Sequence, residues 1–168
     1  MAYWPDRGVA VTGHDQTRSA PLYTAEQRAR RDATRWTMVQ GVLAPVQFAA
    51  FLVSLVLVLR FLATGEGYVA ASASILIKTA LLLAIMVTGA AWEKAVFGRW
   101  LFAPAFFWED VVSFGVIALH LLYVWMLLAG GFAPAAEMAV ALSAYAAYVV
   151  NAGQFLLKLR AARLEGPA

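Results

Sequence analysis

Three carboxylates flank an unusually aromatic stretch in the middle of the sequence. Glu93 lies near its start, and Glu109 and Asp110 lie at its end. His120 follows eleven residues after Glu109, so a helix would place both on one face. A carboxyl group at the rim of an apolar pocket is desolvated, which favours the neutral form that can donate a proton. These residues therefore predict acid–base chemistry, with interfacial ion pairs to nearby basic residues as the alternative.

His120 is the only histidine within an apolar span, and three interpretations of it stay open. It can be a hydrogen-bonded histidine between helices, the magnesium ligand of a chlorophyll-type pigment, or an acid–base group. A bis-histidine haem is disfavoured because the other histidine, His14, lies in the polar N-terminal tail. The sequence has no cysteine, which excludes disulfides, thiolate metal sites and iron–sulfur clusters, and zinc or non-haem iron sites lack ligands.

A second set of residues has the chemistry to bind a flat, apolar, ring-shaped ligand. Aromatic side chains would stack on such a ring, although an interfacial aromatic belt is the default interpretation. Polar side chains on the apolar spans would hold water or ring substituents, and Lys78 either pairs with a carboxylate or carbonyl or anchors a substrate carboxylate. The aromatic candidates are Trp92, Trp100, Phe106, Phe107 and Trp108, and the polar candidates are Gln40, Gln47, Lys78, Tyr148, Asn151 and Gln154.

Long apolar runs must position these side chains, since 62% of the residues are hydrophobic. Runs of about 20 apolar residues match the thickness of a bilayer. The sequence predicts an all-α polytopic membrane protein, a four-transmembrane-helix bundle with an N-terminal amphipathic basic helix. We expect a mobile polar tail at 1–21, a single domain at 22–165, an amphipathic helix at about 25–36, spans at about 37–62, 69–91, 109–129 and 135–157, and an aromatic cytoplasmic connector at 92–108.

The distribution of basic residues predicts the orientation of these spans. Four spans place both termini on one side, and arginine and lysine cluster near the termini and in the connector. The turns at 64–68 and 130–134 contain neither. The positive-inside rule then puts the termini and the connector in the cytoplasm. The polar candidates would extend from the cytoplasmic face to the midplane of the membrane. The half of the bundle on the other side of the midplane would be almost purely apolar. This pattern predicts a pocket open to the cytoplasm and disfavours a transporter.

Three long strings and one short one carry a resemblance to a known family. They occupy residues 22–48, 85–114, 118–120 and 148–165, and the second reads IMVTGAAWEKAVFGRWLFAPAFFWEDVVSF. On these strings the chain resembles the vinyl-bacteriochlorophyllide hydratase family of phototrophic bacteria, from about Leu22 to Glu165. The resemblance implies a hydro-lyase of bacteriochlorophyll biosynthesis in a bacterial inner or intracytoplasmic membrane. Such an enzyme adds water across the C3-vinyl group of a chlorophyllide or bacteriochlorophyllide and gives the 3-(1-hydroxyethyl) pigment.

The resemblance implies no redox cofactor, because the magnesium belongs to the tetrapyrrole substrate. It does not assign catalytic residues, so their roles are hypotheses. Glu109 or Asp110 would protonate the terminal vinyl carbon, while Glu93 or the other of the two would orient water. His120 would ligate the substrate magnesium or act as the base. The macrocycle would stack on the connector aromatics.

A non-catalytic interpretation stays open beside the enzymatic one. A pigment-binding assembly factor or a small subunit of a photosynthetic complex would use the same aromatic residues and His120. It would not need three carboxylates. The expected partners are a magnesium tetrapyrrole and membrane lipid, with no nucleic acid, and a homo-oligomer or contact with neighbouring pigment-biosynthesis enzymes is a further expectation.

Overall fold

The computed structural model describes residues 22–164, and within that range every regular element is a helix. The expected tail at 1–21, with His14, and Glu165 at the end of the expected domain lie outside the described residues. The helices are α1 (Ala25–Ala33), α2 (Arg35–Thr64), α3 (Tyr68–Phe97), α4 (Phe107–Ala129) and α5 (Pro134–Leu164). The all-α prediction is confirmed.

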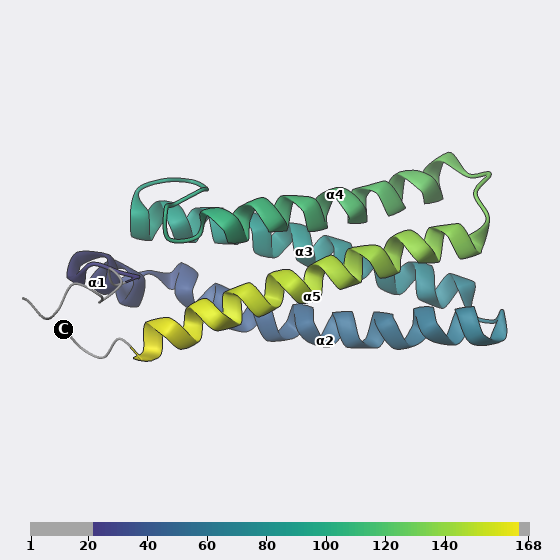
Figure 1. Ribbon diagram of the computed structural model, residues 1–168, viewed down its shortest axis with the longest axis horizontal. Coiled ribbons are helices and arrows are strands. Elements are labelled where there is room, and N and C mark those ends of the chain that lie inside the picture. The colour runs from purple at the N-terminus through teal and green to yellow at the C-terminus, as the bar shows by residue number, and fades with distance from the viewer. Residues whose placement is uncertain (1–21, 165–168) are drawn as a thin grey trace, which may run out of the picture.

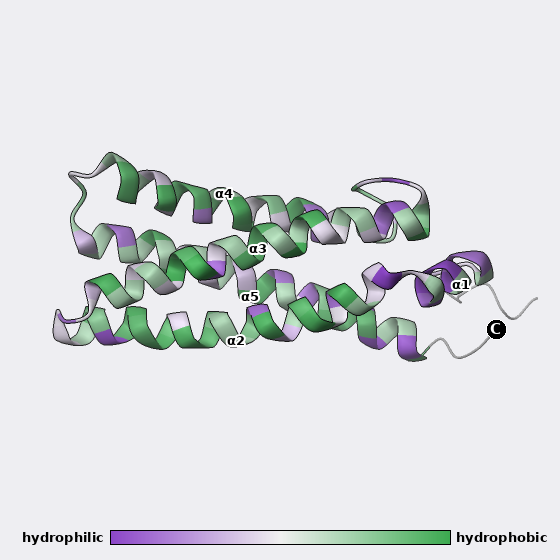
Figure 2. Cartoon of the chain, turned by 180° about the vertical axis from the view of Figure 1, so that it is seen from behind, coloured by the Kyte–Doolittle hydropathy of each residue, from purple (hydrophilic) through white to green (hydrophobic). Residues whose placement is uncertain are grey.

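Helices α2 to α5 are each long and apolar enough to cross a membrane. The shortest, α4, has 23 residues, which at about 1.5 Å per residue exceeds the thickness of a bilayer core. Figure 2 shows apolar residues along most of these four helices and polar residues concentrated on α1. The predicted multi-pass membrane protein with four spans is confirmed.

The basic helix α1 is separated from the first span by a single extended residue. Its start is a capping box, in which Thr24 Oγ1 accepts from the Gln27 backbone N–H and Gln27 Oε1 accepts from the Thr24 N–H. The helix ends at Ala33, earlier than expected, because Thr34 takes an extended conformation (ψ 137°) and caps α2 instead.

The four long helices form two antiparallel hairpins, with α2 packed along α3 and α4 packed along α5. Figure 1 shows α1, the start of α4 and the last turn of α5 at one end of the bundle. We call this the connector end, because it also holds residues 98–106 between α3 and α4. The turns at 65–67 and 130–133 lie at the opposite end, the turn end.

The connector is shorter than the expected 92–108. Helix α3 continues through Trp92 and Glu93 because no residue breaks it before Gly98, which caps it in the left-handed conformation (φ 78°). Helix α4 then begins at Phe107. A helix can continue after its chain has left the apolar layer of the membrane. The predicted end of a membrane span is therefore a poor guide to the end of the helix.

Buried polar contacts join the two hairpins towards the turn end. Tyr68 on α3 donates a hydrogen bond to Glu137 on α5, and Glu137 is only 4% exposed. Nearer the middle, the hydroxyls of Ser54 on α2 and Tyr145 on α5 are hydrogen-bonded. The expectation that this half is almost purely apolar is therefore wrong. Glu137 directly follows a turn in the sequence, but helical periodicity directs its side chain inward between helices.

Candidate functional site

A cavity of about 790 Å³ lies between the two hairpins on the connector side of the bundle. All four long helices, the connector and the residue before the α1 cap contribute to its lining. Most of the lining is apolar, which is typical of sites for small organic ligands. Its polar and charged side chains are Tyr23, Gln40, Gln47, Trp92, Glu93, Asp110, Ser113, Tyr148, Asn151 and Arg163.

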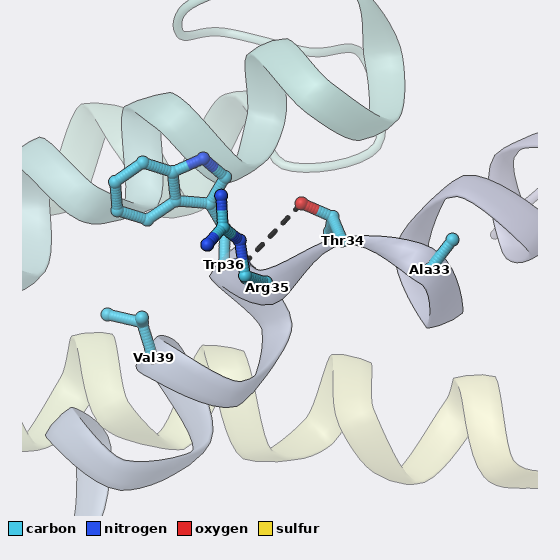
Figure 3. A pocket seen from close by; sticks show the side chains of 5 residues that line it. All are labelled: Ala33, Thr34, Arg35, Trp36 and Val39. Atoms are coloured by element: carbon cyan, nitrogen blue, oxygen red, sulfur yellow. Dashed lines mark hydrogen bonds between the residues drawn. The ribbon is translucent and has the colours of Figure 1, made fainter.

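A second hollow, of about 570 Å³, lies at the junction of α1 and α2. Figure 3 shows the five residues that line it, Ala33, Thr34, Arg35, Trp36 and Val39, with the capping hydrogen bond between the Thr34 hydroxyl and the Trp36 N–H. These residues include no carboxyl group and no histidine. None of the acid–base candidates therefore lines this second hollow.

Glu93 and Asp110 meet on the wall of the cavity. Glu93 is 5% exposed and Asp110 is 4% exposed, and their two carboxyl groups are close enough to interact electrostatically. A hydrogen bond between two carboxyl groups requires a proton on one of them, because an ionised carboxylate can only accept. With one proton between them, the pair would hold an acid and its conjugate base side by side.

Backbone N–H groups of the connector hold this carboxyl pair in place. Ala103 N donates to Glu93 Oε2 at 3.0 Å, and Phe102 N donates to Asp110 Oδ2 at 2.7 Å. Phe102 has φ 57°, a left-handed conformation that costs a non-glycine residue on the order of 1 kcal/mol. The connector thus adopts a strained conformation at the residue that binds Asp110.

Glu109, the neighbour of Asp110, lies outside the cavity lining. Its Oε1 is 3.6 Å from Lys158 Nζ, and Lys158 also donates to the Ala105 carbonyl. Its backbone carbonyl accepts from Asn151 Nδ2 at 3.0 Å. Consecutive residues of a helix are about 100° apart, so Asp110 faces the cavity when Glu109 faces α5. The structure brings Glu93 to Asp110 on the cavity wall and turns the side chain of Glu109 towards Lys158 on α5.

His120 and Lys78 form a buried pair beneath the cavity and do not line it. Lys78 Nζ is 2.9 Å from His120 Nε2, and His120 Nδ1 is 2.8 Å from the Val116 carbonyl. Nδ1 must donate to that carbonyl, so Nε2 accepts from Lys78. Lys78 Nζ also lies 4.2 Å from the ring centroid of Tyr148, which lines the cavity. The lysine therefore contacts the ring of a residue that lines the cavity.

Phe106 is the centre of an aromatic cluster at the connector end. Its ring centroid lies 5.5 Å from that of Trp92, 6.0 Å from that of Phe155 and 6.4 Å from that of Tyr23. All four residues line the cavity. Trp92 and Phe106 were among the sequence candidates, whereas Tyr23 and Phe155 were not. The remaining aromatic candidates, Trp100, Phe107 and Trp108, are exposed and lie outside the lining.

Four of the polar candidates line the cavity: Gln40, Gln47, Tyr148 and Asn151. Gln40 Nε2 donates to Thr88 Oγ1 at 2.7 Å, and Asn151 Oδ1 accepts from Ser113 Oγ at 3.2 Å. Gln47 is buried and its Oε1 has no hydrogen-bond partner, so it can accept a hydrogen bond from water or a ligand. Gln154 lies outside the lining.

Arg163 is a charged residue of the cavity lining that was not among the candidates from the sequence. It lies beyond the expected end of the fourth span but still within α5, which continues to Leu164. Asn151, Phe155, Leu159 and Arg163 recur every four residues, and all four line the cavity. That spacing, carried past the expected span, was the signal that could have found it.

The arrangement can deliver a proton into an apolar, aromatic cavity and accept one back. Among residues 22–164 no group of three or more histidine or acidic side chains is placed to hold a metal ion. The chemistry that the described side chains support is general acid–base catalysis by the Glu93–Asp110 pair.

Comparisons with known proteins agree on one family. A model of the family described as 2-vinyl bacteriochlorophyllide hydratase matches residues 23–161. A protein named 2-vinyl bacteriochlorophyllide hydratase from Cereibacter sphaeroides is 71% identical over 144 residues, which cover 86% of this chain and 89% of the relative. A protein of the same name from Rhodobacter capsulatus is 70% identical over 144 residues, covering 86% and 84%. No solved structure matches the chain.

Proposed function

The chain belongs to the 2-vinyl bacteriochlorophyllide hydratase family, and we propose that the cavity between its hairpins is where it hydrates the pigment. The protein is a hydro-lyase of bacteriochlorophyll biosynthesis, which adds water across a vinyl group of a bacteriochlorophyllide. The observation that supports this location is the Glu93–Asp110 carboxyl pair, which is the acid–base group on the wall of the cavity.

The cavity suits a flat, largely apolar macrocycle. Its volume of about 790 Å³ is in the upper range for sites that enclose one organic ligand. Trp92, Phe106 and Phe155 provide aromatic surface on which a tetrapyrrole can stack. The magnesium ion enters as part of the substrate, and hydration changes no oxidation state overall, so the reaction calls for no redox cofactor.

The carboxyl pair supplies the proton and takes it back. The protonated member transfers its proton to the terminal vinyl carbon, which forms a C–H bond and leaves a cation next to the ring. That cation is delocalised into the macrocycle. Water then attacks the cationic carbon and forms the C–O bond, while the ionised member of the pair accepts the proton that the water loses. The pair ends with one proton, as it began.

Polar residues near the pair would hold the attacking water. Asn151 and Ser113 are hydrogen-bonded to each other and line the cavity on the α4–α5 side. Gln47 brings an unpaired oxygen from the opposite hairpin. A water bound at two such groups has lost part of its freedom before it reacts, which lowers the entropic barrier to attack.

Asp110 takes the acid role in this proposal in preference to Glu109, because Glu109 is committed to Lys158 at the helix interface. Lys78 and His120 are positioning residues for Tyr148 here, since both nitrogens of His120 already have partners. A magnesium ligand role for His120 would require the Lys78 bond to break and the Tyr148 ring to move aside.

The membrane placement is also part of the proposal. The connector end faces the cytoplasm of a bacterial inner or intracytoplasmic membrane, with both termini on that side. Basic residues at this end support the orientation: Lys94, Arg99, Lys158, Arg160 and Arg163. The substrate would then enter the cavity from the cytoplasmic leaflet, and the surrounding lipid is the second partner.

Isotope labelling of a single turnover tests the proposed function. The purified protein, in lipid nanodiscs, is incubated with a 3-vinyl bacteriochlorophyllide in oxygen-labelled water or in heavy water. The product should gain the mass of one water, with labelled oxygen on the carbinol carbon and one deuterium in its methyl group. A stoichiometric pigment complex without any mass gain would favour the pigment-binding interpretation instead.

A further inference from the structure

Arg163 is the one arginine or lysine among the described residues that line the cavity. From its position we propose that Arg163 binds the propionate carboxylate of the pigment, and that this contact makes the enzyme selective for unesterified pigment. The inference rests on the proposed function, because it requires the macrocycle to occupy this cavity. It adds a specificity-determining residue at the end of the cavity remote from Tyr148.

Two other basic side chains at the connector end, Lys158 and Arg31, already have partners. Lys158 donates to a connector carbonyl and lies 3.6 Å from Glu109. Arg31 donates to Asp32 at 2.8 Å. Arg163 has no ion pair or hydrogen bond from its side chain to another residue within 22–164. Its guanidinium group is therefore available to an anionic ligand.

The position of Arg163 along α5 leaves room for a macrocycle between it and the reacting groups. Asn151, whose Nδ2 binds the carbonyl of the residue before Asp110, is twelve residues earlier on the same helix. At about 1.5 Å per residue the two are separated by about 18 Å along the helix axis. The side chains of Phe155 and Leu159 line the interval. A ring stacked there would have its vinyl group near Asp110 and its flexible propionate arm towards Arg163.

The chemistry of arginine fits this role better than that of lysine. A guanidinium group offers parallel N–H donors that match both oxygens of a carboxylate. Arg163 is exposed at the last turn of α5, so its charge stays hydrated until the ligand arrives and requires no buried counter-ion. An ester has no negative charge and would lose this contact.

A substrate-by-variant comparison tests the role of Arg163. Wild type and Arg163→Gln are assayed with the free-acid vinyl pigment and with its propionate methyl ester. Arg160→Gln is the matched control, because Arg160 is exposed one helical turn earlier and does not line the cavity. For wild type we expect a KM about 10-fold higher with the ester, the scale of a charge-assisted hydrogen bond.

In Arg163→Gln the KM for the acid should rise to that for the ester, while the KM for the ester and both kcat values stay within about twofold. Arg163→Lys should recover part of the preference for the acid, and Arg160→Gln should behave as wild type. Equal KM values for acid and ester in the wild-type enzyme would overturn the proposal, as would a variant that weakens both substrates alike. Failure of the proposed function is distinct: wild type would then hydrate neither pigment.

Discussion

Replacing either member of the carboxyl pair with its amide should abolish most of the activity and leave the fold intact. In Glu93→Gln the amide oxygen can still accept from Ala103 N, and the amide N–H₂ can still donate to Asp110. The hydrogen bonds that hold the connector therefore survive. The proton that moves between the two carboxyl groups and the substrate is lost.

The expected loss follows from the role of that proton. General acid–base catalysis contributes about 10²- to 10⁴-fold, so kcat should fall by that factor in Glu93→Gln and in Asp110→Asn. This corresponds to a barrier higher by about 3–5 kcal/mol. Because the bonds to the connector are retained, the free energy of unfolding should change by less than about 1 kcal/mol.

The assay is the initial rate of mass gain by the vinyl pigment, with the melting temperature of each variant measured in the same nanodiscs. Glu109→Gln is the control, since Glu109 pairs with Lys158 outside the cavity lining. It should keep kcat within about tenfold of wild type. The carboxyl-pair mechanism is wrong if both pair variants keep more than a tenth of wild-type kcat, or if Glu109→Gln alone is inactive.

Four further variants test the packing beside the cavity and at the turn end. His120→Ala leaves the buried Lys78 amine without its acceptor and should destabilise the protein by about 3–5 kcal/mol, whereas Lys78→Met combined with His120→Leu should be much less destabilised in thermal melts. Phe106→Ala removes the centre of the aromatic cluster, so we expect a stability loss of about 3–5 kcal/mol and an increased KM in steady-state assays. Tyr68→Phe leaves Glu137 without its donor at the turn end and should lower stability by about 1–3 kcal/mol without a change in kcat, and a large fall in kcat there would contradict the placement of the site.

The sequence predicted the helices because an apolar run that crosses a bilayer must pair its own backbone N–H and C=O groups. A helix does so within a single segment. It also placed Glu93 and Asp110 on either side of one aromatic stretch. They flank a segment whose two ends must return to the same face of the bundle, so the ends of α3 and α4 are necessarily neighbours.

The choice between Glu109 and Asp110 could not be made from the sequence. Two consecutive residues point in directions about 100° apart, and the rotation of α4 is set by its packing on α5. The Asn151 bond to the Glu109 carbonyl and the Lys158 ion pair are tertiary contacts that determine this rotation. The same limit applies to His120, whose partner Lys78 is 42 residues away in the chain.

The extent of the cavity was underestimated for a different reason. The expected spans end where hydropathy falls, but α5 continues as a helix to Leu164 and carries Arg163 to the cavity. Tyr23 precedes α1 and reaches the cavity only because α1 folds back against α3. Hydropathy reports where a chain leaves lipid and does not report where it stops being helical.

The carboxyl pair has a mechanical consequence as well as a chemical one. Glu93 belongs to the first hairpin and Asp110 to the second, so a proton shared between them would link the two halves of the bundle at the connector end. Tyr68 and Glu137 fasten the halves at the far end. If both carboxyl groups are ionised, Glu93 and Asp110 repel each other at the connector end, while the Tyr68–Glu137 hydrogen bond still joins the hairpins at the turn end. The two hairpins would then move apart at the connector end while they stay joined at the turn end. The proton that reacts with the pigment would therefore also keep the connector end closed.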